Sequence, residues 1–418
     1  MSSNNHEILV LGGNMGGVNA VHNLLRSTIP TLKRLNPSKS YHVTLVTPNT
    51  DFFYKIGSPR ALINATALPY SKLFRPLSEA FSQYDASQFN LVQGVASSLD
   101  ASKRTVTVTT GTEEKQIQYD SLIISTGTTS KSPLWTLHND QSLTTKALES
   151  MHTELPKAKT VVVAGGGAVG VETAGEIAAA HPSCKVTLLS GSHRVLDRVK
   201  EATSIRAQDY LEKVVHVEVV HNVRVDSVSG EHPVTLKLSD GSTREVDLYI
   251  DATGGKANSE FLPKSWLDET GRVVTRDVYF RVKGNGTDDV KQVYVLGDIV
   301  AGSSNAALEL DPMVTTLCSS LAVDVASSLE GAKKEEPSSG FIGSLFAKFF
   351  GGGAGAYPKQ LEFKPLKDTL VVPIGPSGGV GQIMGWRMPS LMVYMGKGRS
   401  YLIELIEPTI TGSKWKKV

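Results

Sequence analysis

The sequence predicts an α/β fold built on a duplicated unit and followed by a small α+β domain. Residues 8–46 and 160–189 each show a buried strand, a glycine-rich turn, a helix and a second buried strand. The two units begin about 150 residues apart, so one internal duplication organises most of the chain. Residues 358–406 return to strand-like alternation with room for a helix. This order predicts two Rossmann-like dinucleotide-binding domains and a C-terminal domain.

Length and composition exclude several classes of protein. The chain has 418 residues, which predicts two or three domains. Its 43 Lys and Arg residues nearly balance 41 Asp and Glu residues, so the net charge of +2 gives no reason to expect nucleic acid as a partner. Only two cysteines, Cys184 and Cys318, are present, which excludes a disulfide scaffold, a CxxC redox pair and a four-thiolate metal site. With so few cysteines, we also expect no bound metal. The start of the chain is polar and no apolar run could span a bilayer, so we expect a cytoplasmic protein.

The first glycine turn spans residues 12–17. In a dinucleotide-binding turn the first glycine makes the turn, the second lets the pyrophosphate approach, and the third lets the helix pack on the strand. Gly12 and Gly17 fit the first and third roles, whereas Asn14 stands in the middle position. Asn brings a side chain to the place where phosphate approaches, although it tolerates unusual backbone angles. The predicted contacts of this turn are Gly12, Gly13, Asn14, Met15, Gly16 and Gly17.

The second glycine turn follows the strand 160–164. Here Gly165, Gly167 and Gly170 fill all three roles. One such motif is weak evidence for a nucleotide, because glycine-rich turns also occur in α/β proteins that bind none. Two copies, each between a strand and a helix, indicate that the chain binds two dinucleotides.

Neither copy ends its second strand with the acid that ordinarily binds the adenosine ribose. Thr47 stands there in the first copy and Ser190 in the second. An acid at position 190 would favour NADH and repel the extra phosphate of NADPH, whereas Arg194 could reach that phosphate. We therefore favour NADPH over NADH, and NADH stays open because Arg194 can also face solvent.

Later strands end in short polar motifs. Residues 119–127 and 248–254 each form a buried strand that ends in Thr-Gly, and residues 293–298 form one that ends in Gly-Asp. Asp298 is placed to accept hydrogen bonds from a ribityl chain, although a strand that ends in a surface turn fits the same pattern. The remaining predicted cofactor contacts are Val95, Thr126, Gly127, Gly254 and Gly297.

Together these motifs resemble the two-dinucleotide-binding-domain flavoproteins (pyridine nucleotide-disulfide oxidoreductase-like) over nearly the whole chain. Within that family, residues 51–60, 167–177 and 379–399 resemble the branch of the AMID, or ferroptosis-suppressor-like, NAD(P)H:quinone oxidoreductases. The resemblance implies FAD at the first turn and NAD(P)H at the second. It also implies hydride transfer to the flavin and electron transfer onward to a quinone.

The resemblance also implies roles for single residues and an order of domains. It implies flavin near Arg60 and Asp298, and it makes Glu172 and Lys397 the candidate catalytic residues, near the nicotinamide and near the flavin or substrate. Ser2 replaces the glycine of myristoylated members, so a lipid anchor is not implied. The predicted divisions are 1–152 and 255–330 for the FAD-binding domain, 153–254 for the NAD(P)H-binding domain, 331–357 for a flexible insertion and 358–418 for the C-terminal domain.

Several alternatives stay open. The Glu172 carboxylate can simply stabilise the N-terminus of a helix, and Lys397 can be a surface lysine between two glycines. Residues 341–350 are rich in large apolar side chains and can touch a membrane peripherally or, as we favour, pack as a flap. The function can instead be that of a biosynthetic flavoprotein acting on one small metabolite, or of a slow redox sensor. The sequence does not predict the oligomeric state.

Overall fold

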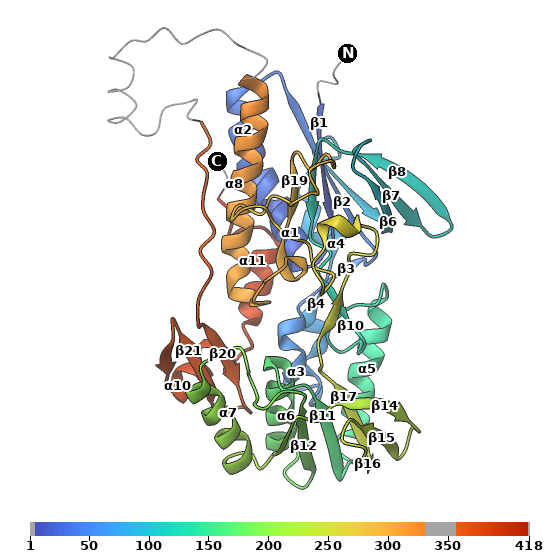
Figure 1. Cartoon of the computed structure of the whole chain (residues 1–418), viewed down its shortest axis with the longest axis vertical. Helices are drawn as coiled ribbons and strands as arrows, with labels where there is room; N and C mark the ends of the chain where they lie inside the picture. The colour runs from blue at the N-terminus through green and yellow to red at the C-terminus, as the bar shows by residue number, and fades with distance from the viewer. Residues whose placement is uncertain (1–4, 331–356, 417–418) are drawn as a thin grey trace.

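Two parallel sheets lie one above the other along the long axis of the molecule (Figure 1). The structure is a computed structural model that describes residues 5–330 and 357–416. One sheet contains the first strand of the chain, and the other contains strands from its middle. Helices follow the strands of each sheet along the chain and cover that sheet. The predicted α/β fold with two Rossmann-like units is therefore confirmed.

The first sheet is parallel, and its inner strands are largely buried. Val10 lies beside Leu45 on one side and beside Ile123 on the other. All three side chains are buried, as expected for a parallel sheet covered on both faces. From edge to edge its strands are β19 (Val293–Val295), β9 (Ser121–Ile124), β1 (Asn5–Leu11), β2 (Ser40–Thr47) and β5 (Phe89–Gln93).

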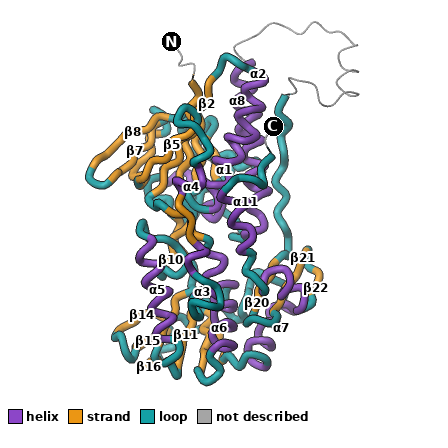
Figure 2. The backbone as a smooth tube through the Cα atoms, turned by 180° about the vertical axis from the view of Figure 1, so that it is seen from behind, coloured by secondary structure: helices purple, strands orange, loops and turns teal. Residues whose placement is uncertain are grey.

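Helices from both ends of the chain cover this sheet. Helix α1 (Met15–Asn23) follows the first glycine turn, and a π-helical turn joins it to α2 (Ile29–Leu35). Helix α8 (Leu310–Glu330) packs beside α1, as both views of the backbone show (Figure 2). Helix α8, from late in the chain, therefore completes the helical layer that α1 begins directly after the first strand.

The second sheet repeats the arrangement of the first. Val163 lies beside Leu188 and Ile250, so the central strand again pairs with a neighbour on each side. Helices α6 (Ala168–Ala180) and α7 (Glu201–Lys213) belong to this unit. From edge to edge its strands are β13 (Glu218–His221), β12 (Lys185–Ser190), β11 (Thr160–Ala164) and β17 (Leu248–Asp251).

Small antiparallel sheets are attached to both units. The sequence predicts such a sheet within residues 91–108, and this is correct from Val95 onward but wrong for 91–93, which belong to the parallel strand β5. The first of these sheets contains β6 (Val95–Asp100), β7 (Thr105–Thr110) and β8 (Glu113–Gln118). The second contains β14 (Val225–Ser229), β15 (Val234–Leu238) and β16 (Thr243–Val246).

Short elements join the two units. The strands β10 (Thr128–Ser130) and β18 (Gly255–Ala257) pair antiparallel where the chain passes between the sheets. A second short pair consists of β3 (Asp51–Phe53) and β4 (Phe74–Pro76). In sequence, α3 (Ser58–Ala61) and α4 (Leu77–Phe81) lie next to this second pair, between β2 and β5 of the first unit, whereas α5 (Gln141–Glu154) precedes the second unit.

The C-terminal residues form a separate antiparallel sheet beside the second unit (Figure 1). Residues 357–366 run along α8 before they reach it. Its strands are β20 (Leu370–Pro373), β21 (Gly379–Ile383) and β22 (Trp386–Met388), and its helices are α10 (Ser390–Val393) and α11 (Ile406–Ile410). Helix α11 returns to the first unit and contacts α1 and α4.

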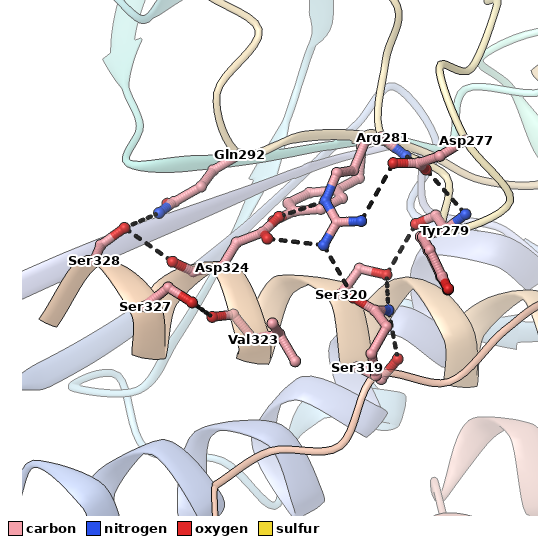
Figure 3. Close-up of polar contacts among 12 residues, drawn as sticks. Asp277, Tyr279, Arg281, Gln292, Ser319, Ser320, Val323, Asp324, Ser327 and Ser328 are labelled. Atoms are coloured by element: carbon pink, nitrogen blue, oxygen red, sulfur yellow. Dashed lines mark hydrogen bonds and ion pairs between the residues drawn. The ribbon is translucent and has the colours of Figure 1, made fainter. Parts of the chain in front are cut away.

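A polar cluster fastens α8 to the first sheet and to the segment that follows it (Figure 3). Two guanidinium nitrogens of Arg281 each donate to a carboxylate oxygen of Asp324 at 2.8 Å. The hydroxyl of Tyr294 donates to the same carboxylate at 2.7 Å. Gln360 accepts from Arg281 at 3.0 Å and donates to Ser320 at 2.8 Å. We call this set the Arg281 cluster.

Among the residues that the structure describes, no helix combines the length and the apolar character needed to cross a membrane. The apolar stretch 341–350 lies outside the described residues.

Candidate active site

A cavity of about 1220 Å³ extends between the two parallel sheets and the C-terminal sheet. Its wall includes the loops at the carboxyl ends of β1, β2, β9 and β19 in the first unit. It continues over the start of α6 and the end of β17 in the second unit, and over β20 in the C-terminal part. Ligands of parallel α/β sheets bind beyond the carboxyl ends of the strands, so this cavity is the expected place for both dinucleotides.

The first glycine turn has the tight geometry that the motif predicts. Gly12 has a φ of +106°, which favours glycine. A Cβ atom at this position would overlap with the carbonyl oxygen of Ser125. A Cβ atom at Gly17 would overlap with the carbonyl oxygen of Gly12, so this glycine lets α1 pack on the turn. The first and third positions of the motif therefore require glycine.

Asn14, in the middle position, lies at the start of α1 and lines the cavity. Its side chain makes no cap hydrogen bond, and its buried Oδ1 has no partner among the described residues. Buried polar atoms are ordinarily hydrogen-bonded, so the amide has unused capacity toward the cavity. By rotating its amide, Asn14 can present an N–H group to a phosphate oxygen at a helix N-terminus. The residue therefore fits a bound pyrophosphate.

The second glycine turn repeats this geometry. Gly165 has a φ of +126°, and a Cβ atom there would overlap with the carbonyl oxygen of Ala252. A Cβ atom at Gly170 would overlap with the carbonyl oxygen of Gly165. Gly167 has open space where its Cβ atom would be, which leaves its backbone accessible to a phosphate group. The second turn therefore fits all three roles of the motif.

The ends of the second strands differ between the two units. Thr47 is buried under Gly13 and lines the cavity. Ser190 is buried under Gly166, and its hydroxyl lies 3.1 Å from the backbone oxygens of Ser192 and Arg194. The guanidinium of Arg194 donates to the backbone oxygen of Asp197 at 2.7 Å. Arg194 is therefore held by its own loop, and its contact with a 2′-phosphate stays a prediction.

Asp298 lines the cavity as one partner of an ion pair. Its Oδ2 lies 2.8 Å from Nζ of Lys55, which also lines the cavity. The positive charge of Lys55 lowers the pKa of Asp298, and Arg272 adds to this effect. Asp298 is therefore ionised at neutral pH and keeps further lone pairs for hydroxyl donors. The preceding Gly297, with a φ of +83°, makes the turn that presents it.

Glu172 and Lys397 form a second ion pair in the cavity wall. Glu172 comes from the first turns of α6, and Lys397 comes from the π-helical turn Tyr394–Gly398. The side chain of Glu172 is 3% exposed and that of Lys397 is 16% exposed. Burial raises the pKa of Glu172, and the positive charge of Lys397 opposes that rise. The cavity wall therefore contains an ammonium group held by a buried carboxylate.

Comparison with known proteins agrees with this geometry. A model of the pyridine nucleotide-disulphide oxidoreductases matches residues 6–316. The chain belongs to this family. It is 30% identical to the oxidoreductase phnG of Penicillium herquei over 100% of this chain and 98% of the relative. It is 23% identical to human ferroptosis suppressor protein 1 over 95% of this chain and 93% of the relative.

Solved structures show the same fold. NDH2 from Plasmodium falciparum in complex with NADH matches with a TM-score of 0.60 and 15% sequence identity, over 98% of each chain. As a pyridine nucleotide-disulphide oxidoreductase family member, the protein is an oxidoreductase.

The two cysteines of this family member do not lie at the cavity. Cys184, just before β12, and Cys318, in α8, are both buried and free. Burial raises the pKa of the Cys318 thiol to about 12, so it stays a thiol at neutral pH. The chemistry of the cavity is therefore not that of a redox-active disulfide, despite the family name.

Most of the predicted site residues are brought together at the cavity. Those that line it are Gly12, Gly13, Asn14, Met15, Gly16, Thr47, Val95, Thr126, Gly127, Glu172, Gly254, Gly297, Asp298 and Lys397. Those outside its wall are Gly17, Arg60, Gly165, Gly167, Gly170, Ser190 and Arg194. Gly17, Gly165 and Gly170 pack against neighbouring backbone and shape the turns, Gly167 has open space beside it, and Arg60 is bound by Glu176.

Sequence reasoning missed several charged groups, and three of them illustrate why. Lys55 pairs with Asp298, Glu176 pairs with Arg60, and Arg198 lines the cavity. Lys55 stands inside the stretch 51–60 that carries the family resemblance, so that stretch gave a signal. Glu176 follows Glu172 by one helical turn, and this spacing puts both carboxylates on one face of α6. Nothing in the sequence around Arg198 distinguishes it from a surface arginine.

Proposed function

We propose that the protein is an FAD-dependent oxidoreductase that takes hydride from NAD(P)H and passes electrons to a quinone-type acceptor. The observation that supports it most is the single cavity that both units share. One wall carries the first glycine turn and Asp298, and the other carries Glu172 and Lys397. A chain that bound one nucleotide as a structural element would not need a cavity common to both units.

The residues that would hold FAD are those of the first turn, with Gly12 forming the turn, Asn14 offering its amide and Asp298 accepting from hydroxyl groups. The second turn would hold NAD(P)H, with the open face of Gly167 toward the phosphates. When bound, the flavin supplies a ring that accepts hydride from the nicotinamide and releases electrons to an acceptor. The protein supplies binding, orientation and electrostatics.

Lys397 is the residue that we propose acts on the acceptor. Its ammonium group, held by Glu172 at the cavity wall, would stabilise negative charge that develops on an acceptor oxygen. A quinone fits this requirement because its oxygens gain negative charge on reduction. The resemblance to the quinone-reducing branch, through residues 51–60, 167–177 and 379–399, supports the same acceptor class.

Anaerobic mixing of the purified protein with NADH and NADPH separately tests this function. We expect a yellow protein whose flavin absorbance bleaches with the nicotinamide and returns when a water-soluble quinone is added. A colourless protein that cannot be loaded with FAD would contradict the proposal at its first step. Bleaching without recovery on addition of quinone would remove quinones as the acceptor. The donor that bleaches the flavin faster decides between NADPH and NADH.

A further inference from the structure

Five side chains from three parts of the chain meet at the cavity wall and directly behind it. Arg60 comes from α3 of the first unit, and Glu172 and Glu176 come from one face of α6 in the second unit. Lys397 and Tyr401 come from the C-terminal part. The set contains two cations and two carboxylates, so its charge is balanced, and it contains one tyrosine. We call it the Arg60 cluster.

Arg60 binds Glu176 with both arms of its guanidinium group. Its Nε donates to Oε2 and its Nη2 donates to Oε1, each at 2.7 Å. The side chains are 12% and 4% exposed, so the pair is nearly shielded from water. The guanidinium carbon lies 4.8 Å from the ring centre of Tyr401, whose hydroxyl donates to Oε1 of Glu176 at 3.1 Å. Glu176 therefore accepts three hydrogen bonds, and none of them comes from Lys397.

Lys397 is connected to the Arg60–Glu176 pair through the same tyrosine. Its ammonium nitrogen lies 5.8 Å from the ring centre of Tyr401, and its backbone oxygen accepts from the backbone nitrogen of Tyr401 at 2.7 Å. Glu172 and Glu176 are one helical turn apart, a spacing that a long lysine side chain can cover. Lys397 nevertheless pairs with Glu172, which lines the cavity, while Glu176 does not line it.

Tyr401 is held in an uncommon conformation that supports this arrangement. It is fully buried with a φ of +52°, and the next residue, Leu402, has a φ of +58°. The hydroxyl of Tyr54 donates to the backbone oxygen of Leu402 at 2.8 Å. Residues that carry a Cβ atom adopt such φ angles only when their surroundings enforce them. The ring over which both cations lie is therefore fixed in place.

We propose that Arg60 is a positioning residue that reserves Lys397 for Glu172. A guanidinium fork matches a carboxylate with two parallel hydrogen bonds, whereas an ammonium group is a mobile point charge that accepts either carboxylate as partner. By occupying both oxygens of Glu176, Arg60 leaves Glu172 as the carboxylate available to Lys397. The inference rests on the proposed function, because it names the residue that keeps the ammonium group at the cavity.

Removal of the guanidinium would change the partner of Lys397. Without Arg60, Glu176 becomes a buried carboxylate without a compensating charge, a state that proteins avoid at high cost. Lys397 is the other cation of the cluster and would turn to Glu176, away from the cavity. The ammonium group would then no longer face the acceptor, although Lys397 itself is unchanged.

Chemical labelling of Lys397 tests this positioning without any turnover. Trace acetic anhydride labels accessible amines, and peptide mass spectrometry reports the rate at Lys397 relative to an exposed lysine such as Lys103. In Arg60→Met we expect the rate at Lys397 to fall by about tenfold, because the amine exchanges a partner that lines the cavity for a buried one that does not. In Arg60→Met/Glu176→Gln the competing carboxylate is gone, so the rate should return to that of the wild type.

The double variant separates positioning from general damage. If Arg60 only supported the fold, the second substitution would leave the labelling rate as low as in Arg60→Met or lower it further, and the proposal would be wrong. An unchanged rate in Arg60→Met would also overturn it. If Arg60→Met does not fold, Arg60→Gln with and without Glu176→Gln makes the same comparison, because glutamine keeps a donor but no charge.

Quinone turnover and Arg281→Met complete the test. Turnover should fall in Arg60→Met and recover in Arg60→Met/Glu176→Gln, in parallel with labelling. Arg281→Met removes an equally bidentate arginine outside the cavity wall and should leave the labelling of Lys397 unchanged. If the wild type reduces no quinone, the proposed function fails, whereas the labelling rates still decide whether Arg60 positions Lys397.

Discussion

The Arg281 cluster and the Arg60 cluster use the same chemistry in two regions of the molecule. Each centres on an arginine that binds a carboxylate with two hydrogen bonds, at 2.8 Å in the Arg281–Asp324 pair and at 2.7 Å in the Arg60–Glu176 pair. In each, a buried tyrosine donates its hydroxyl to the same carboxylate. Local geometry alone does not distinguish a pair that fastens the fold from a pair that prepares a site.

The surroundings of the two arginines make the difference. Arg281 also contacts a second carboxylate, that of Asp277 at 3.3 Å, and Gln360 and Ser320 complete the cluster; all of these groups fasten α8 and lie outside the cavity wall (Figure 3). The Arg60 pair instead lies beside a second ion pair that opens to the cavity. The first arrangement predicts an effect on stability, and the second predicts an effect on the charge at the cavity wall.

Substitution of Lys397 by methionine should give the largest effect on catalysis. It removes the ammonium group and keeps the length of the side chain. We expect quinone turnover to fall by roughly 100-fold or more, as when one charge-stabilising donor is lost from an active site. FAD should remain bound, because Lys397 contacts neither glycine turn among the described residues. Steady-state turnover with matched flavin content measures this, and unchanged turnover would remove Lys397 from the mechanism.

The same variant should change the pH dependence of flavin reduction. Burial raises the pKa of Glu172 and Lys397 opposes the rise, while Glu176 raises this pKa and Arg60 lowers it, both to a smaller extent. Loss of Lys397 therefore raises the pKa of Glu172 further. A step that requires the Glu172 carboxylate is lost as the pH falls through this pKa, so its acid limb should move to higher pH. A limb at the same pH in both proteins would show that the two residues are uncoupled in solution.

Arg281→Met should lower stability and leave catalysis intact. It leaves Asp324 without its cation, and because that carboxylate is 24% exposed we expect a loss of about 2 to 3 kcal/mol in the free energy of unfolding. Denaturant unfolding measures the loss, and Arg281→Met/Asp324→Asn should recover part of it. Reduced quinone turnover in the folded Arg281→Met protein would break the comparison between the two clusters.

The sequence predicted the fold and the first contacts of the site because these depend on local patterns. Buried strands, glycine turns and apolar helices recur at short spacing, and each is fixed by backbone sterics and burial. The ion pairs could not be predicted from the sequence, because Arg60 and Glu176 are separated by 116 positions and Glu172 and Lys397 by 225. Only the folded chain shows that Arg60 is engaged by a carboxylate, where the family resemblance implied contact with the flavin.

The Lys55–Asp298 pair extends the comparison to the cavity itself. Asp298→Ala removes an acceptor from the cavity wall and leaves Lys55 without its partner. We expect FAD to bind about tenfold more weakly, the effect of one hydrogen bond to a charged group. Dialysis against FAD-free buffer with absorbance at each step measures retention. Lys55→Met is the matched control, since it disrupts the same pair but keeps the carboxylate, and full retention of flavin in Asp298→Ala would contradict its assigned role.

The smallest effects should come from the two tyrosine hydroxyls, and they give the sharpest comparison. Tyr401→Phe and Tyr294→Phe each delete one hydroxyl that donates to a carboxylate, the buried Glu176 in one case and the partly exposed Asp324 in the other. Each should cost about 1 kcal/mol of stability, because the rings and their packing remain. Only Tyr401→Phe should also alter the labelling rate of Lys397. The reason is that its hydroxyl donates to Glu176, the carboxylate that competes for the ammonium group of Lys397. An equal change in Tyr294→Phe would mean that loosening anywhere in the fold reaches the cavity, and the two clusters would then differ in position but not in role.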